Sequence, residues 1–152
     1  MAYGLSVCDI LKISDNEIQW FSGKEDYTEG IHMLQQTYQI PLILLSMGKD
    51  GSRAYYKDML VEVPAFLQKN TIETTGAGDT FGACCLHHIL KYGLDNLTKQ
   101  QLKEMLTFAN AAASIKAEYQ APGKCKIFSL FCCLGFPKGL TLDRLQLTGQ
   151  IF

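Results

Sequence analysis

Residues 74–81 read Thr-Thr-Gly-Ala-Gly-Asp-Thr-Phe, and this stretch is more informative than any other in the 152-residue chain. Two glycines flank one small residue, Asp79 follows at once, and an apolar helical pattern begins directly after it. Backbone amides in such a turn can converge on an anion at the positive end of a helix. A carboxylate beside a phosphate repels it, but it can take a proton from a hydroxyl that attacks the phosphate. The stretch therefore predicts phosphoryl transfer to an alcohol.

Two common phosphate-binding loops do not fit this stretch. A Walker loop needs Lys and Ser or Thr after its last glycine, whereas Asp79 follows Gly78. A dinucleotide-binding fingerprint needs a third glycine at the position that Phe81 occupies. A simple tight connection between a strand and a helix is the structural alternative, because glycine-rich turns are common in such connections.

The full stretch closely resembles the signature of ribokinase-like (pfkB-type) carbohydrate kinases. Three further segments carry the same resemblance: Lys12 with Glu17 upstream, residues 46–51 (Ser-Met-Gly-Lys-Asp-Gly) in the middle, and residues 108–113 (Phe-Ala-Asn-Ala-Ala-Ala) downstream. Their order and spacing resemble those of bacterial fructokinases. The resemblance covers about residues 3–118 and implies an incomplete ribokinase-like fold, an α/β layered fold with a mostly parallel sheet. Only the C-terminal half of the family domain is expected.

By position, the resemblance implies catalytic roles for four residues of the glycine turn. Asp79 corresponds to the family's catalytic base, which deprotonates a primary hydroxyl of the sugar. The amides of Gly76, Ala77 and Gly78 correspond to the anion hole that holds the transferring phosphate. Phosphoryl transfer depends on positioning and charge stabilisation, which these groups would supply.

The nucleotide side of the site is implied in the same way. Ser46 and Gly48 match a strand end that borders the nucleotide phosphates and ribose, and Asn110 matches a position beside the adenine pocket. Thr75, within the signature itself, is assigned to the same cofactor-binding set. ATP is the implied phosphate donor.

Glu17 matches the acidic end of the family's Asn-x-x-Glu motif, which organises Mg²⁺ and phosphates through water. Ser14 stands where the family has asparagine, and Ser14-x-x-Glu17 also fits a helix capping box, so a purely structural role is the alternative. A monovalent cation is a further cofactor of the family. Glu73 stands at a position associated with its loop, where the family has aspartate.

Hydrophobic periodicity predicts strands that alternate with helices, which is typical of an α/β fold. Strands are expected at residues 9–13, 42–45, 53–56 and 60–63, the last two antiparallel. Helices are expected from residues 14–17 to Gly23, at 27–38, at 79–92 and from a Thr98-x-x-Gln101 capping box onward. Inward-facing positions include Ile115, and Trp20 is expected in the core rather than in a stacking platform.

Composition and charge exclude several classes of function. The formal net charge is −1 and no basic-aromatic pattern is present, so a nucleic-acid partner is not expected. The N-terminus has no secretory signal pattern, and the longest strongly apolar run, residues 127–136, is about half of the ~20 residues that span a bilayer. The chain is expected to be cytoplasmic. Its six cysteines show no paired metal-binding spacing and are expected to be free thiols.

Composition changes after about Tyr119. Residues 120–152 carry a net charge of +3 and half of the cysteines, without clear helical or strand periodicity. The sequence therefore predicts a kinase-like part at residues 1–119 and an atypical tail at residues 120–152, disordered or arising from a shifted reading frame.

The predicted function is ATP-dependent phosphorylation of a fructose-like sugar. The family's sugar-binding half is not expected in this chain, so a non-catalytic nucleotide-binding remnant is the alternative. A marginally folded fragment with exposed sheet edges is a third possibility. Oligomeric state is not predicted.

Overall fold

The computed structural model describes residues 2–67 and 76–118, with side chains for residues 3–67 and 76–115. The predictions made for Thr75, Glu73 and the tail at residues 120–152 lie outside the described residues. The elements in chain order are α1 (Ala2–Ser6), β1 (Ile10–Ser14), α2 (Asp15–Ser22), α3 (Tyr27–Tyr38), β2 (Leu42–Ser46), a 3-10 turn (Gly48–Asp50), β3 (Ser52–Tyr56), β4 (Met59–Val63), α4 (Ala77–Tyr92) and α5 (Lys99–Glu118).

Four strands form one sheet in the order β1-β2-β3-β4. β1 and β2 are parallel, with Ile10 opposite Leu42 and Ser14 opposite Ser46. The other two pairs are antiparallel, so within the described residues the sheet is mixed rather than mostly parallel. Connection length explains the difference, because α2 and α3 make the crossover that a parallel pair needs, while β2-β3 and β3-β4 are joined by short turns.

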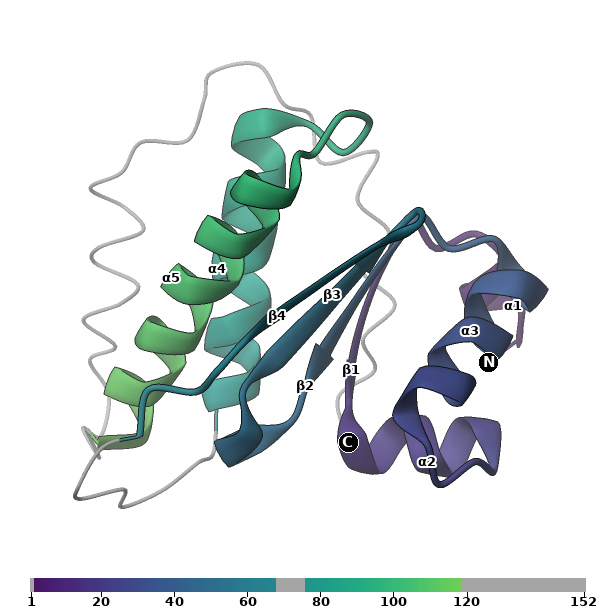
Figure 1. Cartoon of the computed structure of the whole chain (residues 1–152), viewed down its shortest axis with the longest axis horizontal. Helices are drawn as coiled ribbons and strands as arrows, with labels where there is room; N and C mark the ends of the chain where they lie inside the picture. Colours follow the sequence, from purple (N-terminus) through teal and green to yellow (C-terminus); the bar gives the residue numbers. More distant parts are fainter. Residues whose placement is uncertain (1, 68–75, 119–152) are drawn as a thin grey trace.

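Helices cover both faces of the sheet (Figure 1), which confirms the α/β layered class. α4 and α5 pack on one face, and α2 and α3 on the other. β2 is buried along both faces, as expected for a central strand without polar alternation. Two apolar cores result. The one beneath α4 and α5 includes Leu44, Tyr56 and Met105, and the other includes Ile18, Ile31 and Leu45.

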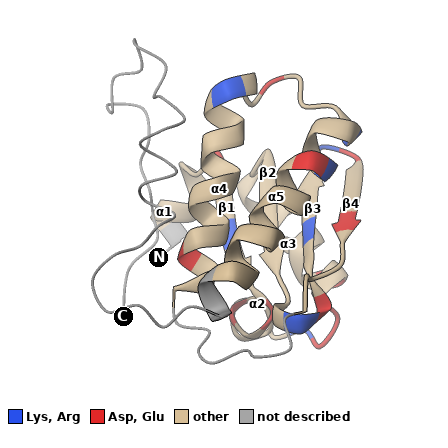
Figure 2. Ribbon diagram, turned by 90° about the vertical axis from the view of Figure 1, so that its left-hand side faces the viewer, with Lys and Arg blue, Asp and Glu red and all other residues tan. Residues whose placement is uncertain are grey.

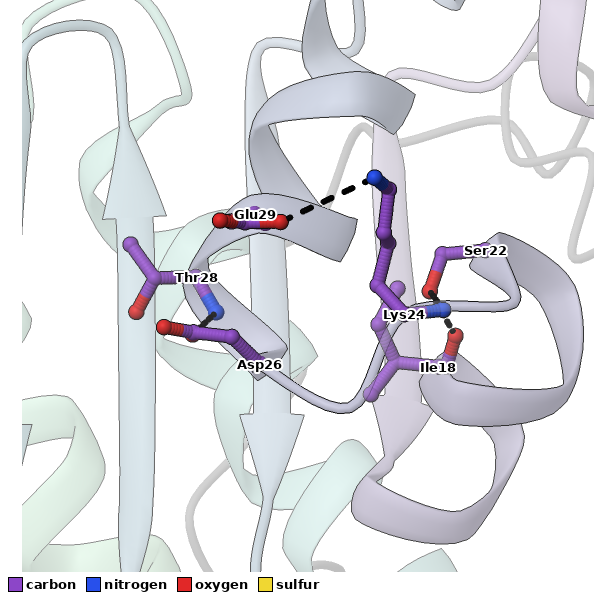
Figure 3. Close-up of polar contacts among 6 residues, drawn as sticks. All are labelled: Ile18, Ser22, Lys24, Asp26, Thr28 and Glu29. Carbon is purple, nitrogen blue, oxygen red and sulfur yellow. Dashed lines mark hydrogen bonds and ion pairs between the residues drawn. The ribbon is translucent and has the colours of Figure 1, made fainter.

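Side chains fix the junction between α2 and α3 (Figure 3). Ser22 Oγ donates to the carbonyl of Ile18 (2.7 Å) and accepts from the amide of Lys24 (3.1 Å). The carboxylate of Asp26 accepts from the amide of Thr28 at 2.7 Å and so caps α3. Lys24 Nζ lies 3.8 Å from a carboxylate oxygen of Glu29, an exposed ion pair of small energetic weight.

Two expectations about burial are wrong. Trp20 is 73% exposed, because α2 turns Ile18 rather than Trp20 toward the sheet. Ile115, in the last turns of α5, is 49% exposed instead of facing inward. A helix on the surface of a sheet buries one stripe of residues, so an apolar side chain beside that stripe stays in solvent.

Three cysteines fall within the described side chains, and all three are free and buried, as expected. Burial raises the pKa of Cys84 to about 11, and it raises the pKa of Cys85 as well, helped by the neighbouring thiol. Such thiols are inert, since the thiolate is the reactive form. Among the described helices, none has the length and apolar character that crossing a bilayer requires.

Candidate phosphate-binding cleft

The helix after the glycine turn begins at Ala77, two residues earlier than expected. Its N-cap is Gly76, which has a left-handed backbone (φ 81°) and makes no side-chain cap. The first intrahelical hydrogen bond runs from the amide of Thr80 to the carbonyl of Gly76 (3.0 Å). The amides before Thr80 therefore have no hydrogen-bond partner within the helix. They lie at the N-terminus of a 16-residue helix, which is the positive end of its dipole.

A cleft of about 420 Å³ opens where the parallel strands β1 and β2 end. In open α/β sheets, ligands bind outside the carboxyl ends of such strands. Ala77 and Gly78 line the cleft, so the first turn of α4 faces it. Ser46, Gly48 and Asn110 line it as well, and these five sequence-predicted residues are brought together.

Asp79 is the acidic residue in the first turn of α4, and it is exposed. It follows the lining residue Gly78 directly but does not itself line the cleft. The carboxylate is therefore at the margin of the cleft and is not buried in the interior.

Glu17 is not among the residues that line the cleft, but it is hydrogen-bonded to Ser14, which is, and it closes the capping box that was the structural alternative for it. One oxygen of its carboxylate accepts from the amide of Ser14 at 2.7 Å and from the hydroxyl of Ser14 at 2.8 Å. Burial acts to raise the pKa of Glu17, but these two hydrogen bonds and the positive charge of Lys12 hold it below its usual value. Glu17 is thus an ionised cap at the start of α2.

Asn110 has a structural partner at the cleft. Its side-chain amide donates to the carbonyls of Val63 (3.2 Å) and Pro64 (3.0 Å), and the residue is only 8% exposed. These bonds tie α5 to the end of β4. The amide donors are therefore engaged by the protein backbone.

The structure adds residues that the sequence did not single out as site residues. Lys12 and Asp15 line the cleft from β1 and α2, and Phe66 and Leu67 line it after β4. Strand alternation puts Lys12 on the same sheet face as Ser14, but it does not indicate that this face borders a cleft. Phe66 and Leu67 are 45% and 75% exposed, an apolar wall that a flat ring could pack against.

No group of three or more His, Cys, Asp or Glu side chains within the described residues is arranged to hold a metal ion. Among the described lining residues, Asp15 is the acidic one. Mg²⁺ needs few protein ligands when phosphates supply the rest, so Asp15 fits a magnesium ion that arrives with a nucleotide.

We compared the sequence with models of known protein families, and the result fits the glycine turn, the helix α4 and the cleft described above. Residues 2–127 match the pfkB family of carbohydrate kinases. The chain belongs to this family. The match includes the whole of the described part and extends to residue 127, beyond the boundary near residue 119 that the composition predicts.

Its curated relatives include plant and bacterial fructokinases. The chain is 32% identical over 107 residues to probable fructokinase-2 of Arabidopsis thaliana, a match that covers 70% of this chain and 32% of that protein. It is 35% identical over 94 residues to the fructokinase of Klebsiella pneumoniae, covering 61% and 30%. The chain thus spans about a third of the length of these relatives.

Solved structures share the fold. A fructokinase from Vibrio cholerae O395, solved with fructose, ADP and calcium ion bound, matches with a TM-score of 0.68 at 22% identity, covering 79% of this chain and 38% of that one. The ribokinase of Arabidopsis thaliana, solved with ribose and ATP, matches with a TM-score of 0.67 at 23% identity, covering 88% and 43%. The ribokinase-like fold is therefore confirmed.

Proposed function

We propose that this chain carries the nucleotide-binding and catalytic part of an ATP-dependent kinase that phosphorylates a hydroxyl of a fructose-like sugar. The observation that carries the proposal is the first turn of α4, which lines an open cleft with an exposed carboxylate directly beyond it. The fructokinase relatives support fructose as the acceptor. A cytoplasmic location, where ATP is available, goes with this proposal.

The amides of Gly76, Ala77 and Gly78 bind the phosphoryl group as it leaves ATP. Their hydrogen-bonding capacity is unused within α4, and the helix dipole adds positive potential where negative charge spreads over the phosphoryl oxygens. Because the amides are fixed by the helix, little reorganisation accompanies the reaction.

Asp79 takes the proton from the attacking sugar hydroxyl. Its exposure leaves the carboxylate accessible to an acceptor, and its place next to Gly78 puts the base beside the phosphate. A general base of this kind contributes about 10²–10⁴-fold to the rate.

Ser46, Gly48 and Asn110 form the nucleotide side of the cleft, with Phe66 and Leu67 as an apolar wall for the adenine ring. Mg²⁺ bound with ATP would neutralise phosphate charge, with Asp15 at the cleft and Glu17 acting through water as the carboxylates that hold it. Thr75 belongs to the same proposed set but lies outside the described residues.

A second candidate function is nucleotide binding without catalysis, and the short aligned part of the relatives favours it. The chain aligns with about a third of its fructokinase relatives, so groups that position the sugar can lie beyond the aligned part. Proximity supplies a large share of the rate in such reactions. A chain without those groups would bind ATP or ADP and transfer no phosphate.

Phosphate transfer from Mg-ATP to fructose, ribose and glucose distinguishes the two functions. The kinase is expected to phosphorylate fructose fastest, and Asp79→Asn should lower the rate about 10²–10⁴-fold with nucleotide affinity retained. Asp58 is an exposed carboxylate between β3 and β4, so Asp58→Asn is the matched control and should leave the rate unchanged. Nucleotide affinity without turnover would support the binding function, and the absence of both would contradict each.

A further inference from the structure

Lys12 lies in the middle of β1 with its side chain against α4. In the register of the sheet it stands opposite Leu44 of β2. Its Nζ is 3.4 Å from the position that a Cβ on Gly78 would occupy, and its Cγ is 4.0 Å from the corresponding position on Gly82. Figure 2 shows the basic segment of β1 beside α4. Two glycines one helical turn apart thus make room for the lysine stem and bring its ammonium to the start of the helix.

The charge of Lys12 has no direct partner in the described part of the chain. The ion pairs formed there join Lys24 to Glu29 and Arg53 to Glu62, and Lys12 takes no part in a hydrogen bond with another described residue. The nearby carboxylate of Glu17 makes no ion pair with it, because Glu17 is held in its capping box by Ser14. The ammonium also stands at the positive end of α4, where a cation is unfavourable. An anion in the cleft would attract both the ammonium and the helix amides and so offset that repulsion.

We propose that Lys12 binds the phosphoryl group held by the first turn of α4 and is a positioning and charge-neutralising residue of the kinase. This inference rests on the proposed function, since it adds a side chain to the same phosphate site. Lys12 and Gly78 both line the cleft, so one phosphate can contact the ammonium and the helix amides together. Lysine suits this role as a compact point charge on a flexible stem.

A purely structural role for Lys12 makes a different prediction. The stem could simply cover the bare backbone at Gly78 and Gly82, with the ammonium left in water. Methionine has a similar length and no charge, so Lys12→Met keeps the packing and removes only the electrostatic interaction.

Calorimetric titration of the full 152-residue chain with ATP and with adenosine separates these roles. In Lys12→Met the affinity for ATP should fall about tenfold or more, while the affinity for adenosine stays within about twofold of wild type. Lys12→Arg should retain part of the ATP affinity. Lys103→Met, an exposed residue on α5, is the matched control and should change neither value.

Reaction of the unmodified protein with a lysine-acetylating reagent provides a test that needs no variant. ATP should protect Lys12 from acetylation, adenosine should not, and Lys103 should react equally in both cases, as read by mass spectrometry. If ATP binds without protecting Lys12, or if Lys12→Met keeps the preference for ATP over adenosine, the assignment of Lys12 is overturned while the proposed kinase site stands. If wild type binds ATP no more tightly than adenosine, the phosphate site itself is contradicted.

Discussion

Gly76 and Asp79 occupy the positions that their residue types suggest. Gly76 adopts a left-handed backbone as the N-cap, where a side chain would be strained, and Asp79 remains exposed in the first turn of the helix. The contribution of Lys12 was harder to predict. Its neighbours along the chain do not say which helix covers its face of the sheet, and that depends on α4, which begins more than sixty residues later.

Among the described glycines, Gly51, which lines the cleft, has the least room for a side chain. Its φ is 100°, and a Cβ there would stand 2.2 Å from the carbonyl oxygen of Val63, so Gly51→Ala should destabilise the chain by about 3 kcal/mol. Gly48→Ala is the matched comparison, since Gly48 also has a positive φ (52°) but open space around it, and it should cost about 1 kcal/mol. Urea unfolding of both variants measures the difference. Equal losses would show that the contact with β4 carries no weight.

The boundaries of helices were predicted correctly where the sequence carries both a capping residue and a periodic apolar pattern. α3 covers Tyr27–Tyr38 as expected, and both capping boxes form, at Ser14 with Glu17 and at Thr98 with Gln101. α4 begins earlier than expected because the glycine, and not the carboxylate, is its N-cap. The helix at Ala2–Ser6 was not expected, since five residues are too few for a periodic pattern.

The start of α2 should respond to pH through Glu17. Its pKa is below the usual value in the folded chain, so the stabilisation is complete above about pH 4.5 and is lost as the pH falls through the lowered folded pKa. Glu17→Gln keeps an acceptor for the capping box but removes the charge, and at pH 7 it should destabilise the chain by about 0.5 kcal/mol.

Urea unfolding at pH 7 and pH 3 checks this. The difference between wild type and Glu17→Gln should disappear at the lower pH, whereas Glu25→Gln, an exposed carboxylate in the loop before α3, should show little effect at either pH. A difference that grows on acidification would contradict the role of the ionised cap.

At the scale of the whole molecule, the sequence was sufficient for the α/β class, the family and the order of elements, because strand and helix patterns alternate clearly along residues 9–115. For the sheet it was sufficient only in part: the antiparallel pairing of residues 53–56 with residues 60–63 was predicted, whereas the antiparallel pairing of β2 with β3 was not. A short turn favours pairing of the two strands that it joins, but the neighbours that a strand takes are decided when the whole sheet assembles. The assembly of five predicted residues around one cleft likewise required the packing of α4 and α5 on the sheet.

The account depends on phosphate binding at the first turn of α4, and NMR of the ¹⁵N-labelled chain tests this most directly. Adding ATP should shift the backbone amide signals of Gly76, Ala77 and Gly78, whereas adenosine should leave them in place and the amide of Lys103 should be unaffected by either. If ATP binds and the three amide signals do not move, the phosphate lies elsewhere and the proposed kinase site is wrong.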